Sequence, residues 1–281
     1  MNKLLKNFKL KLVKAIIFAF IFTHILLAQV SWSVIPMGFN LKIAPNDTMS
    51  YTFKIRNTGK ENVALKIYIK DIRHNVDGSR KEMESGILSR GMAEWINIAP
   101  KRTEVASGAT NIVRFSIKVP ENVQPGDYWS NIYVESLEKP NLLSRTEDGT
   151  SSFSIFTNIR YAIKLKARIS GNAAIKGEIS KVEIINDTSK DVITIKSTFR
   201  NSGDLILNCT GYVDIRNDMG ETIEKINIRK HKVYPNGIMI INTKMIKTLA
   251  AGEYFALAVI DYGGDYLVAG EAFFEIHAKN E

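Results

Sequence analysis

The stretch SFSIFTNIRYAIKLKARIS, residues 152–170, alternates apolar and polar side chains along its whole length. One face carries Phe153, Ile155, Ile159, Tyr161, Ile163, Leu165, Ala167 and Ile169, and only Thr157 interrupts it. A period of two is typical of a β-strand with one buried face. At about 3.3 Å per residue such a strand spans ~60 Å, more than most strands of globular domains. We therefore expect it to cross between two domains or to project beyond its own sheet.

Shorter alternating runs surround this stretch, among them Tyr51–Arg56, Val63–Lys70 and Val192–Phe199. Turn sequences such as Pro125-Gly126-Asp127 and Pro235-Asn236-Gly237 separate them. Short strands punctuated by Gly, Pro and Asn favour antiparallel sandwiches, and no stretch has a convincing amphipathic helical period. The sequence therefore predicts an all-β fold.

Two internal echoes indicate that one folding unit occurs twice. Ile55-Arg56-Asn57-Thr58-Gly59 returns as Phe199-Arg200-Asn201-Ser202-Gly203, and Pro125-Gly126-Asp127-Tyr128-Trp129 returns as Ala251-Gly252-Glu253-Tyr254-Phe255. The first motif ends a strand in an Asn/Gly turn, and the second places an aromatic residue at the start of a strand, as in the tyrosine corner of immunoglobulin-type sandwiches. We predict two tandem immunoglobulin-like antiparallel β-sandwich domains, residues 29–170 and 171–281, with an insertion at Arg73–Gly91 in the first.

Residues 1–28 predict an export signal. They contain five lysines and no acidic residue. The lysines are followed by an apolar stretch that ends at Ala28, a small residue suited to cleavage. The apolar stretch is short for a membrane span, and an uncleaved signal anchor remains the alternative. We expect the mature chain to be periplasmic or extracellular, and to touch a membrane only through a retained signal.

Composition and motifs argue against catalysis and against nucleic acid. The net charge of +9 falls to +4 without the five signal lysines, which gives little reason to expect a nucleic-acid partner. No HExxH, GxSxG or paired-cysteine motif occurs, and we expect no enzyme activity, no catalytic residue, no metal, no cofactor and no small-molecule substrate. Cys209 is expected to be a buried apolar residue, and His74 and His231 to be solvated surface residues.

The chain resembles the PapD-like periplasmic pilus chaperones, as a divergent member. Phe39-Asn40-Leu41-Lys42-Ile43 and Tyr51–Asn57 are similar to that family's first two strands, and Ile163–Arg168 is similar to the close of its donor strand. The resemblance implies two immunoglobulin-like domains without an essential disulfide, and exported pilus or fimbrial subunits as partners, bound by β-strand addition.

The resemblance also implies a set of site residues. Phe153, Ile155, Thr157 and Ile159 fall on the positions that family members insert into a subunit's groove. Family members hold the subunit's carboxylate with an arginine on the first strand and a lysine on the donor strand. Here the first strand, Ser31–Asn40, has no basic residue and the lysine position reads Ala162, so Arg160 and Lys164 are the expected carboxylate contacts.

Two other interpretations remain open from the sequence. In one, residues 152–170 form a last strand that is already paired in its own sheet, and the protein is an envelope or cell-surface scaffold or polymer-binding protein. In this interpretation the basic face of Arg160, Lys164, Lys166 and Arg168 is a solvated face that protects a sheet edge. In the other, the protein is an enzyme whose paired carboxylates cannot be recognised from the sequence.

Overall fold

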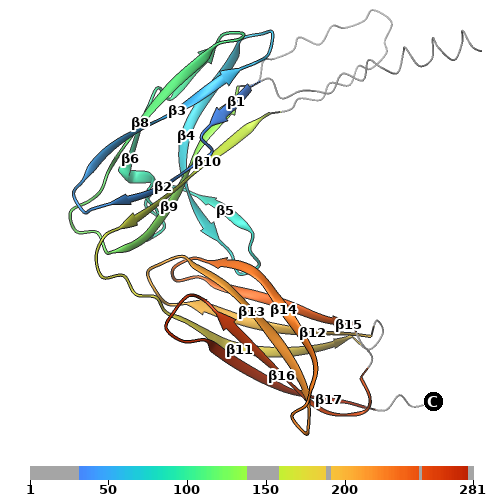
Figure 1. Cartoon of the computed structure of the whole chain (residues 1–281). Coiled ribbons are helices and arrows are strands. Elements are labelled where there is room, and N and C mark those ends of the chain that lie inside the picture. The colour runs from blue at the N-terminus through green and yellow to red at the C-terminus, as the bar shows by residue number, and fades with distance from the viewer. Residues whose placement is uncertain (1–31, 138–157, 188–190, 247–248, 278–281) are drawn as a thin grey trace, which may run out of the picture.

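A computed structural model describes residues 32–137, 158–187, 191–246 and 249–277. Three of the predicted site residues, Phe153, Ile155 and Thr157, and the predicted signal segment lie outside these ranges. Among the described residues the secondary structure is almost entirely β, as predicted, with one short 3₁₀ turn, η1 (Ala93–Trp95). The strands form two sandwiches, one above the other in Figure 1.

The first sandwich consists of two sheets packed face to face. One has the order β1 (Trp32–Ile35), β3 (Thr48–Asn57), β8 (Thr110–Lys118), β6 (Ile96–Ala99). The other has the order β2 (Gly38–Ile43), β10 (Arg160–Ile169), β9 (Gly126–Ser136), β4 (Val63–His74), β5 (Arg80–Met83), and β7 (Arg102–Val105) also pairs with β4. Alternate side chains of each strand point inward, so Phe53, Phe115, Ile163 and Leu165 meet in one core and are almost fully buried.

The second sandwich repeats this arrangement with its own core. One sheet has the order β11 (Gly177–Asp187), β12 (Val192–Asn201), β15 (Ile238–Ile246). The other has the order β14 (Thr222–Val233), β13 (Leu207–Asn217), β16 (Gly252–Asp261), β17 (Val268–Ile276). Phe199, Val213 and Ile260 lie in its core. Cys209 is buried there too, and burial raises the pKa of its thiol to about 12, as expected for an inert apolar residue.

Each internal echo has the same hydrogen bonds in both sandwiches. The amide groups of Asn57 and Asn201 each donate to two backbone carbonyls and accept the N–H of the glycine two residues later. Those carbonyls belong to Glu61 and Val105 for Asn57, and to Leu205 and Val233 for Asn201. The hydroxyls of Tyr128 and Tyr254 each donate to the carbonyl four residues earlier, at 3.0 Å. The repeated unit predicted from the sequence is therefore confirmed at the level of individual contacts.

The predicted first strand, Ser31–Asn40, is wrong as a single element. The chain forms β1 in one sheet, turns at Pro36 and continues as β2 in the other. Proline has no N–H to give to a ladder, so it suits the point where the chain leaves one sheet for the other. Here β2 pairs with β10 in parallel, whereas the other strand pairs of the described chain are antiparallel.

The predicted insertion at Arg73–Gly91 contains the turn between β4 and β5, which reaches the second sandwich (Figure 1). The carbonyl of Val76 at this turn accepts a hydrogen bond of 2.9 Å from the amide of Ile240 on β15. The insertion thus makes a direct contact between the two sandwiches.

Candidate functional site

Strand β10 has a partner along only part of one side. Its register with β9 runs from Arg160 to Ile169, but its register with β2 begins at Lys164, opposite Gly38. Because the chain before Gly38 crosses into the other sheet as β1, no described strand continues the line of β2 beside residues 160–163. With respect to the described residues, this part of β10 is an open edge, and it is called the open edge below.

The hydrogen bonds of β10 show which backbone groups face the open side. The amide of Lys164 donates to the carbonyl of Met37 on the β2 side, at 3.1 Å. Ile159 faces β9, since its amide donates to the Ser136 hydroxyl and its carbonyl accepts the Ser136 amide. Successive residues of a strand alternate in direction, so the N–H and C=O groups of Arg160 and Ala162 point to the open side. Such unpaired groups can pair with another chain.

Ile159 and Arg160 are both held by the protein's own groups. Ile159 packs against the first core and borders a hollow of about 360 Å³ that Trp32, Val63 and Leu137 also line. The Arg160 guanidinium lies 2.7 Å from a Glu82 carboxylate oxygen, donates to the Tyr68 hydroxyl at 3.2 Å and covers the ring of Tyr133. The bond to Tyr68 is the main cause that holds the Arg160 pKa above its ordinary value. Arg160 thus already has a carboxylate partner within the chain.

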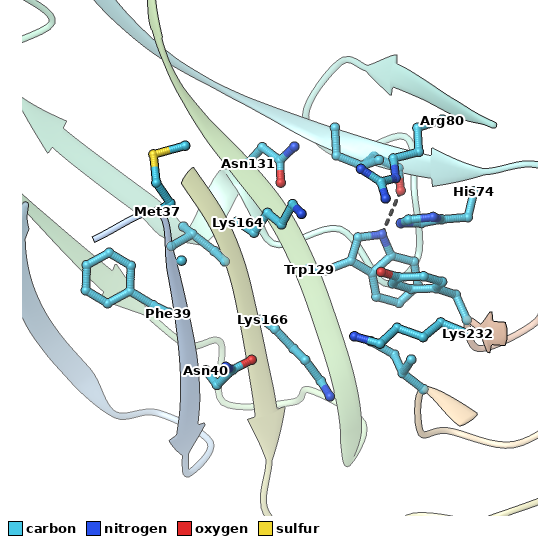
Figure 2. Close-up of a pocket in the computed structure, with 15 residues that line it drawn as sticks. Met37, Phe39, Asn40, His74, Arg80, Trp129, Asn131, Lys164, Lys166 and Lys232 are labelled. Carbon is cyan, nitrogen blue, oxygen red and sulfur yellow. Dashed lines mark hydrogen bonds between the residues drawn. The ribbon is translucent and has the colours of Figure 1, made fainter. Parts of the chain in front are cut away.

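Lys164 borders a cleft between the two sandwiches, with a volume of about 320 Å³ (Figure 2). Four cationic side chains line it: Arg80 from β5, Lys164 and Lys166 from β10, and Lys232 from β14. None of the described residues that line this cleft is acidic. Lys166 lies 3.5 Å from a carboxylate oxygen of Asp127 outside the lining. The cleft therefore favours an anionic ligand.

Aromatic side chains form one wall of the cleft. The imidazole of His74 stacks on the ring of Tyr234 with centroids 3.4 Å apart, and Trp129 meets the same tyrosine at 4.7 Å. The indole N–H of Trp129 donates to the carbonyl of Ile72 at 2.6 Å, a bond that Figure 2 marks. His74 and Trp129 come from the first sandwich and Tyr234 from the second. This wall therefore also joins the two sandwiches.

The expectation that His74 and His231 are solvated surface residues is wrong, since both are half-buried. Burial, and secondarily the charge of Arg80, lowers the pKa of His74 to about 4. Burial also lowers the pKa of His231 below its ordinary value. Stacked against Tyr234, His74 is neutral at neutral pH and contributes a polar ring to the cleft but no charge.

Residues 164–169 of β10 do not form the solvated sheet edge that one interpretation of the sequence expected for the basic face of this strand. Over residues 164–169 the strand is flanked by β2 and β9, and Arg168 donates to both carboxylate oxygens of Asp127 at 2.8 and 2.9 Å. Asp127 is fully buried and also accepts the amide of Ile206, from the second sandwich, at 2.8 Å. Burial opposes its ionisation most strongly, but the bonds from Arg168 and Ile206 and the charge of Lys166 outweigh it, so the Asp127 pKa lies below its usual range.

Arg90 and Asp204 extend this contact between the sandwiches. The buried guanidinium of Arg90 donates to the carbonyl of Pro125 and to the carboxylate of Asp204. The backbone carbonyl of Asp204 accepts the amide of Asp127 at 2.8 Å. With Asp127 and Arg168 these residues form a junction network that fixes the second sandwich beside the cleft.

Sequence reasoning missed Arg80, Lys232 and Tyr234. Arg80 lies in the insertion that only the first repeat carries, and Lys232 ends the basic run Arg229–Lys232 directly before the turn at Pro235. Both features are visible in the sequence. The sequence does not show that these residues line the same cleft, because that depends on how the second sandwich packs against the first.

Comparison with known proteins gives matches among solved structures alone, since no family model and no curated protein matches the chain. A chain of a chaperone–tip adhesin complex of CFA/I fimbriae biogenesis matches with 15% identity and a TM-score of 0.46, over 86% of this chain and 97% of that chain. The class 5 fimbriae chaperone CfaA matches with 15% identity and a TM-score of 0.42, over 88% and 99%. A chain of the Salmonella enterica complex of SafA pilin with the SafB chaperone matches with 11% identity and a TM-score of 0.42, over 85% and 95%.

The described ranges contain neither a candidate metal site nor a candidate membrane-spanning helix. No group of three or more His, Cys, Asp or Glu side chains there could hold a metal ion. No helix there is long and apolar enough to cross a membrane.

Proposed function

We propose that the protein is an exported, chaperone-like factor that binds other exported polypeptides by adding a client strand to the open edge of β10. The observation that carries this proposal is the position of the backbone groups of Arg160 and Ala162, which have no strand partner among the residues that the structure describes. They lie directly before the point where β2 pairs with the same side of β10. An incoming strand would gain backbone hydrogen bonds there and would continue the line of β2.

The cleft sets the direction of the added strand. A client strand along residues 160–163 must stop near Lys164, because Gly38 and the rest of β2 occupy the side beyond it. The end of the client at that point meets the cationic side chains of the cleft. They repel an amino terminus and attract a carboxylate, so the client runs parallel to β10 with its C-terminus near Lys164.

Of the two expected carboxylate contacts, Lys164 suits this role better than Arg160. Lys164 is exposed at the cleft, whereas Arg160 is engaged by Glu82 and Tyr68. The open edge also favours the chaperone-like role over the scaffold, which needs no unpaired groups on β10.

Coexpression with candidate exported polypeptides, each with a free C-terminus, tests the proposal. Ala162→Pro removes one N–H from the open side and none from the β9 ladder, and Lys164→Gln removes the charge at the end of the added strand. Each should weaken a client complex about ten- to a hundredfold, since each removes one bond of about 1–3 kcal/mol. Lys54→Gln, at an exposed lysine of β3, is the control and should leave binding unchanged. Undiminished binding by a folded Ala162→Pro variant contradicts strand addition.

A further inference from the structure

The cleft holds more positive charge than one carboxylate can neutralise. Arg80, Lys164 and Lys232 project into it from three strands, β5, β10 and β14, and the last of these belongs to the second sandwich. Among the described residues none of these three has an ion pair, in contrast to Lys166, which Asp127 partly neutralises. A single terminal carboxylate beside Lys164 leaves two cations without a counter-charge.

The two remaining cations lie around the aromatic wall. Arg80 is close enough to His74 for its charge to lower that residue's pKa, and Figure 2 shows Arg80 and Lys232 on the Trp129 side of the cleft, away from Phe39. Phe39 belongs to β2, the strand that an added client strand would continue. The extra positive charge therefore lies across the cleft from the end of that strand, within one cavity of about 320 Å³.

We propose that the cleft selects clients with a second carboxylate close to their C-terminus, an acidic side chain on the last residue or the third from the end, which Arg80 and Lys232 bind while Lys164 binds the terminal carboxylate. This inference rests on the proposed function. Alternate residues of a strand share a face and lie about 6.6 Å apart. Side chains on the last residue and on the third from the end therefore point the same way, into the cavity of about 320 Å³. Asn131 and the neutral His74 add polar groups but no charge.

Short soluble peptides test the inference apart from strand addition. The probes are acetyl-Val-Thr-Glu with a free terminus, acetyl-Val-Thr-Gln with a free terminus, and acetyl-Val-Thr-Glu amide, which carry two, one and one carboxylates. The indole N–H resonance of Trp129 in the purified protein reports binding, because this side chain lines the cleft. The diacid should bind at least about tenfold more tightly than either monoacid, the effect of one additional charge-assisted bond.

Single variants assign the second carboxylate to its partners. Arg80→Gln and Lys232→Gln should each reduce the preference for the diacid over the glutamine peptide to less than about threefold. Each should also weaken the amide peptide, whose one carboxylate is the glutamate side chain, and change binding of the glutamine peptide little. Lys164→Gln should weaken the two peptides with a free terminus and change the amide peptide little. Lys54→Gln, which removes an equal charge from an exposed position on β3 in the other sheet, should weaken none of the three. A preference for the diacid over the glutamine peptide that persists in both the Arg80 and the Lys232 variant overturns the assignment.

Other results separate this inference from the proposed function. Equal affinity for the diacid and the monoacids, or no change at Trp129 with any peptide up to about 10 mM, overturns the inference and leaves strand addition to its own test. Tight binding of glutarate, equal to that of the diacid peptide, identifies a site for small dicarboxylates and likewise overturns it. A preserved diacid preference together with unaffected client binding by Ala162→Pro contradicts strand addition alone.

Discussion

Replacing Asp127 by Asn removes the charge at the centre of the junction network but keeps the size of the side chain. In the native protein the carboxylate accepts two bonds from Arg168 and one from the Ile206 amide, and it is fully buried. The asparagine has one acceptor oxygen and an NH₂ group. The NH₂ group then faces an N–H donor of Arg168 or of Ile206, and two donors cannot form a hydrogen bond. At least one of these contacts is therefore lost.

The expected cost follows from the exposure of the partners. Removing one partner of a buried ion pair costs about 3–5 kcal/mol, because the remaining charge is left uncompensated. The Arg168 side chain is 44% exposed, so water can solvate most of its charge after the change. We therefore expect the Asp127→Asn variant to lose about 2–3 kcal/mol of stability, less than a fully buried pair would cost.

Urea unfolding followed by tryptophan fluorescence measures this loss, since Trp32, Trp95 and Trp129 all lie in the first sandwich. For a sandwich of this size the midpoint should fall by about 1–2 M urea. Glu121→Gln, at an exposed turn residue, is the control and should not shift the midpoint. The amide of Ile206 should also exchange faster in the variant. A midpoint unchanged from the native protein, with an unchanged Ile206 amide, refutes the role given to Asp127.

Three further outcomes are expected from the contacts and the pKa values. The folded-state pKa of His74, about 4, lies below its unfolded value of 6.5, so stability is complete above pH 6.5 and should fall by about 3 kcal/mol as the pH drops to 4; urea unfolding of the native protein and of His74→Gln across this range measures the difference. Asn57→Ala and Asn201→Ala each leave two carbonyls and a glycine amide without a partner, and each should destabilise its own sandwich by about 1–3 kcal/mol in thermal unfolding. Cys209, whose burial raises its thiol pKa to about 12, should react with a thiol reagent at pH 8 only after unfolding, as followed by absorbance.

The parts of the fold that could be predicted from the sequence are those that depend on nearby residues. Asn57 and Asn201 bond to groups within their own turn, and the Tyr128 and Tyr254 hydroxyls bond four residues back, so a repeated motif implies repeated geometry. The alternation of residues 160–169 likewise gave the buried face of β10 correctly.

The site was less accessible to sequence reasoning, because its contacts join distant residues. Asp127 meets Ile206 and His74 meets Tyr234 across the junction between the sandwiches, and no local pattern marks such pairs. Arg160 was expected to face a client, yet Glu82 of the insertion already holds it. Pro36 can be seen in the sequence as a break within Ser31–Asn40. Its consequence, an open edge on β10, becomes evident only when the structure places β2 beside Lys164.

Residue-resolved amide hydrogen exchange of the purified protein tests the central claim most directly. The amides of Arg160 and Ala162 should exchange at nearly unprotected rates, while those of Tyr161 and Ile163, bonded toward β9, should be slower by about three orders of magnitude or more. Addition of a client should slow Arg160 and Ala162 and leave the other two unchanged. Equal, strong protection of all four amides in the free protein would mean that both sides of β10 are already paired, and would contradict strand addition at this edge.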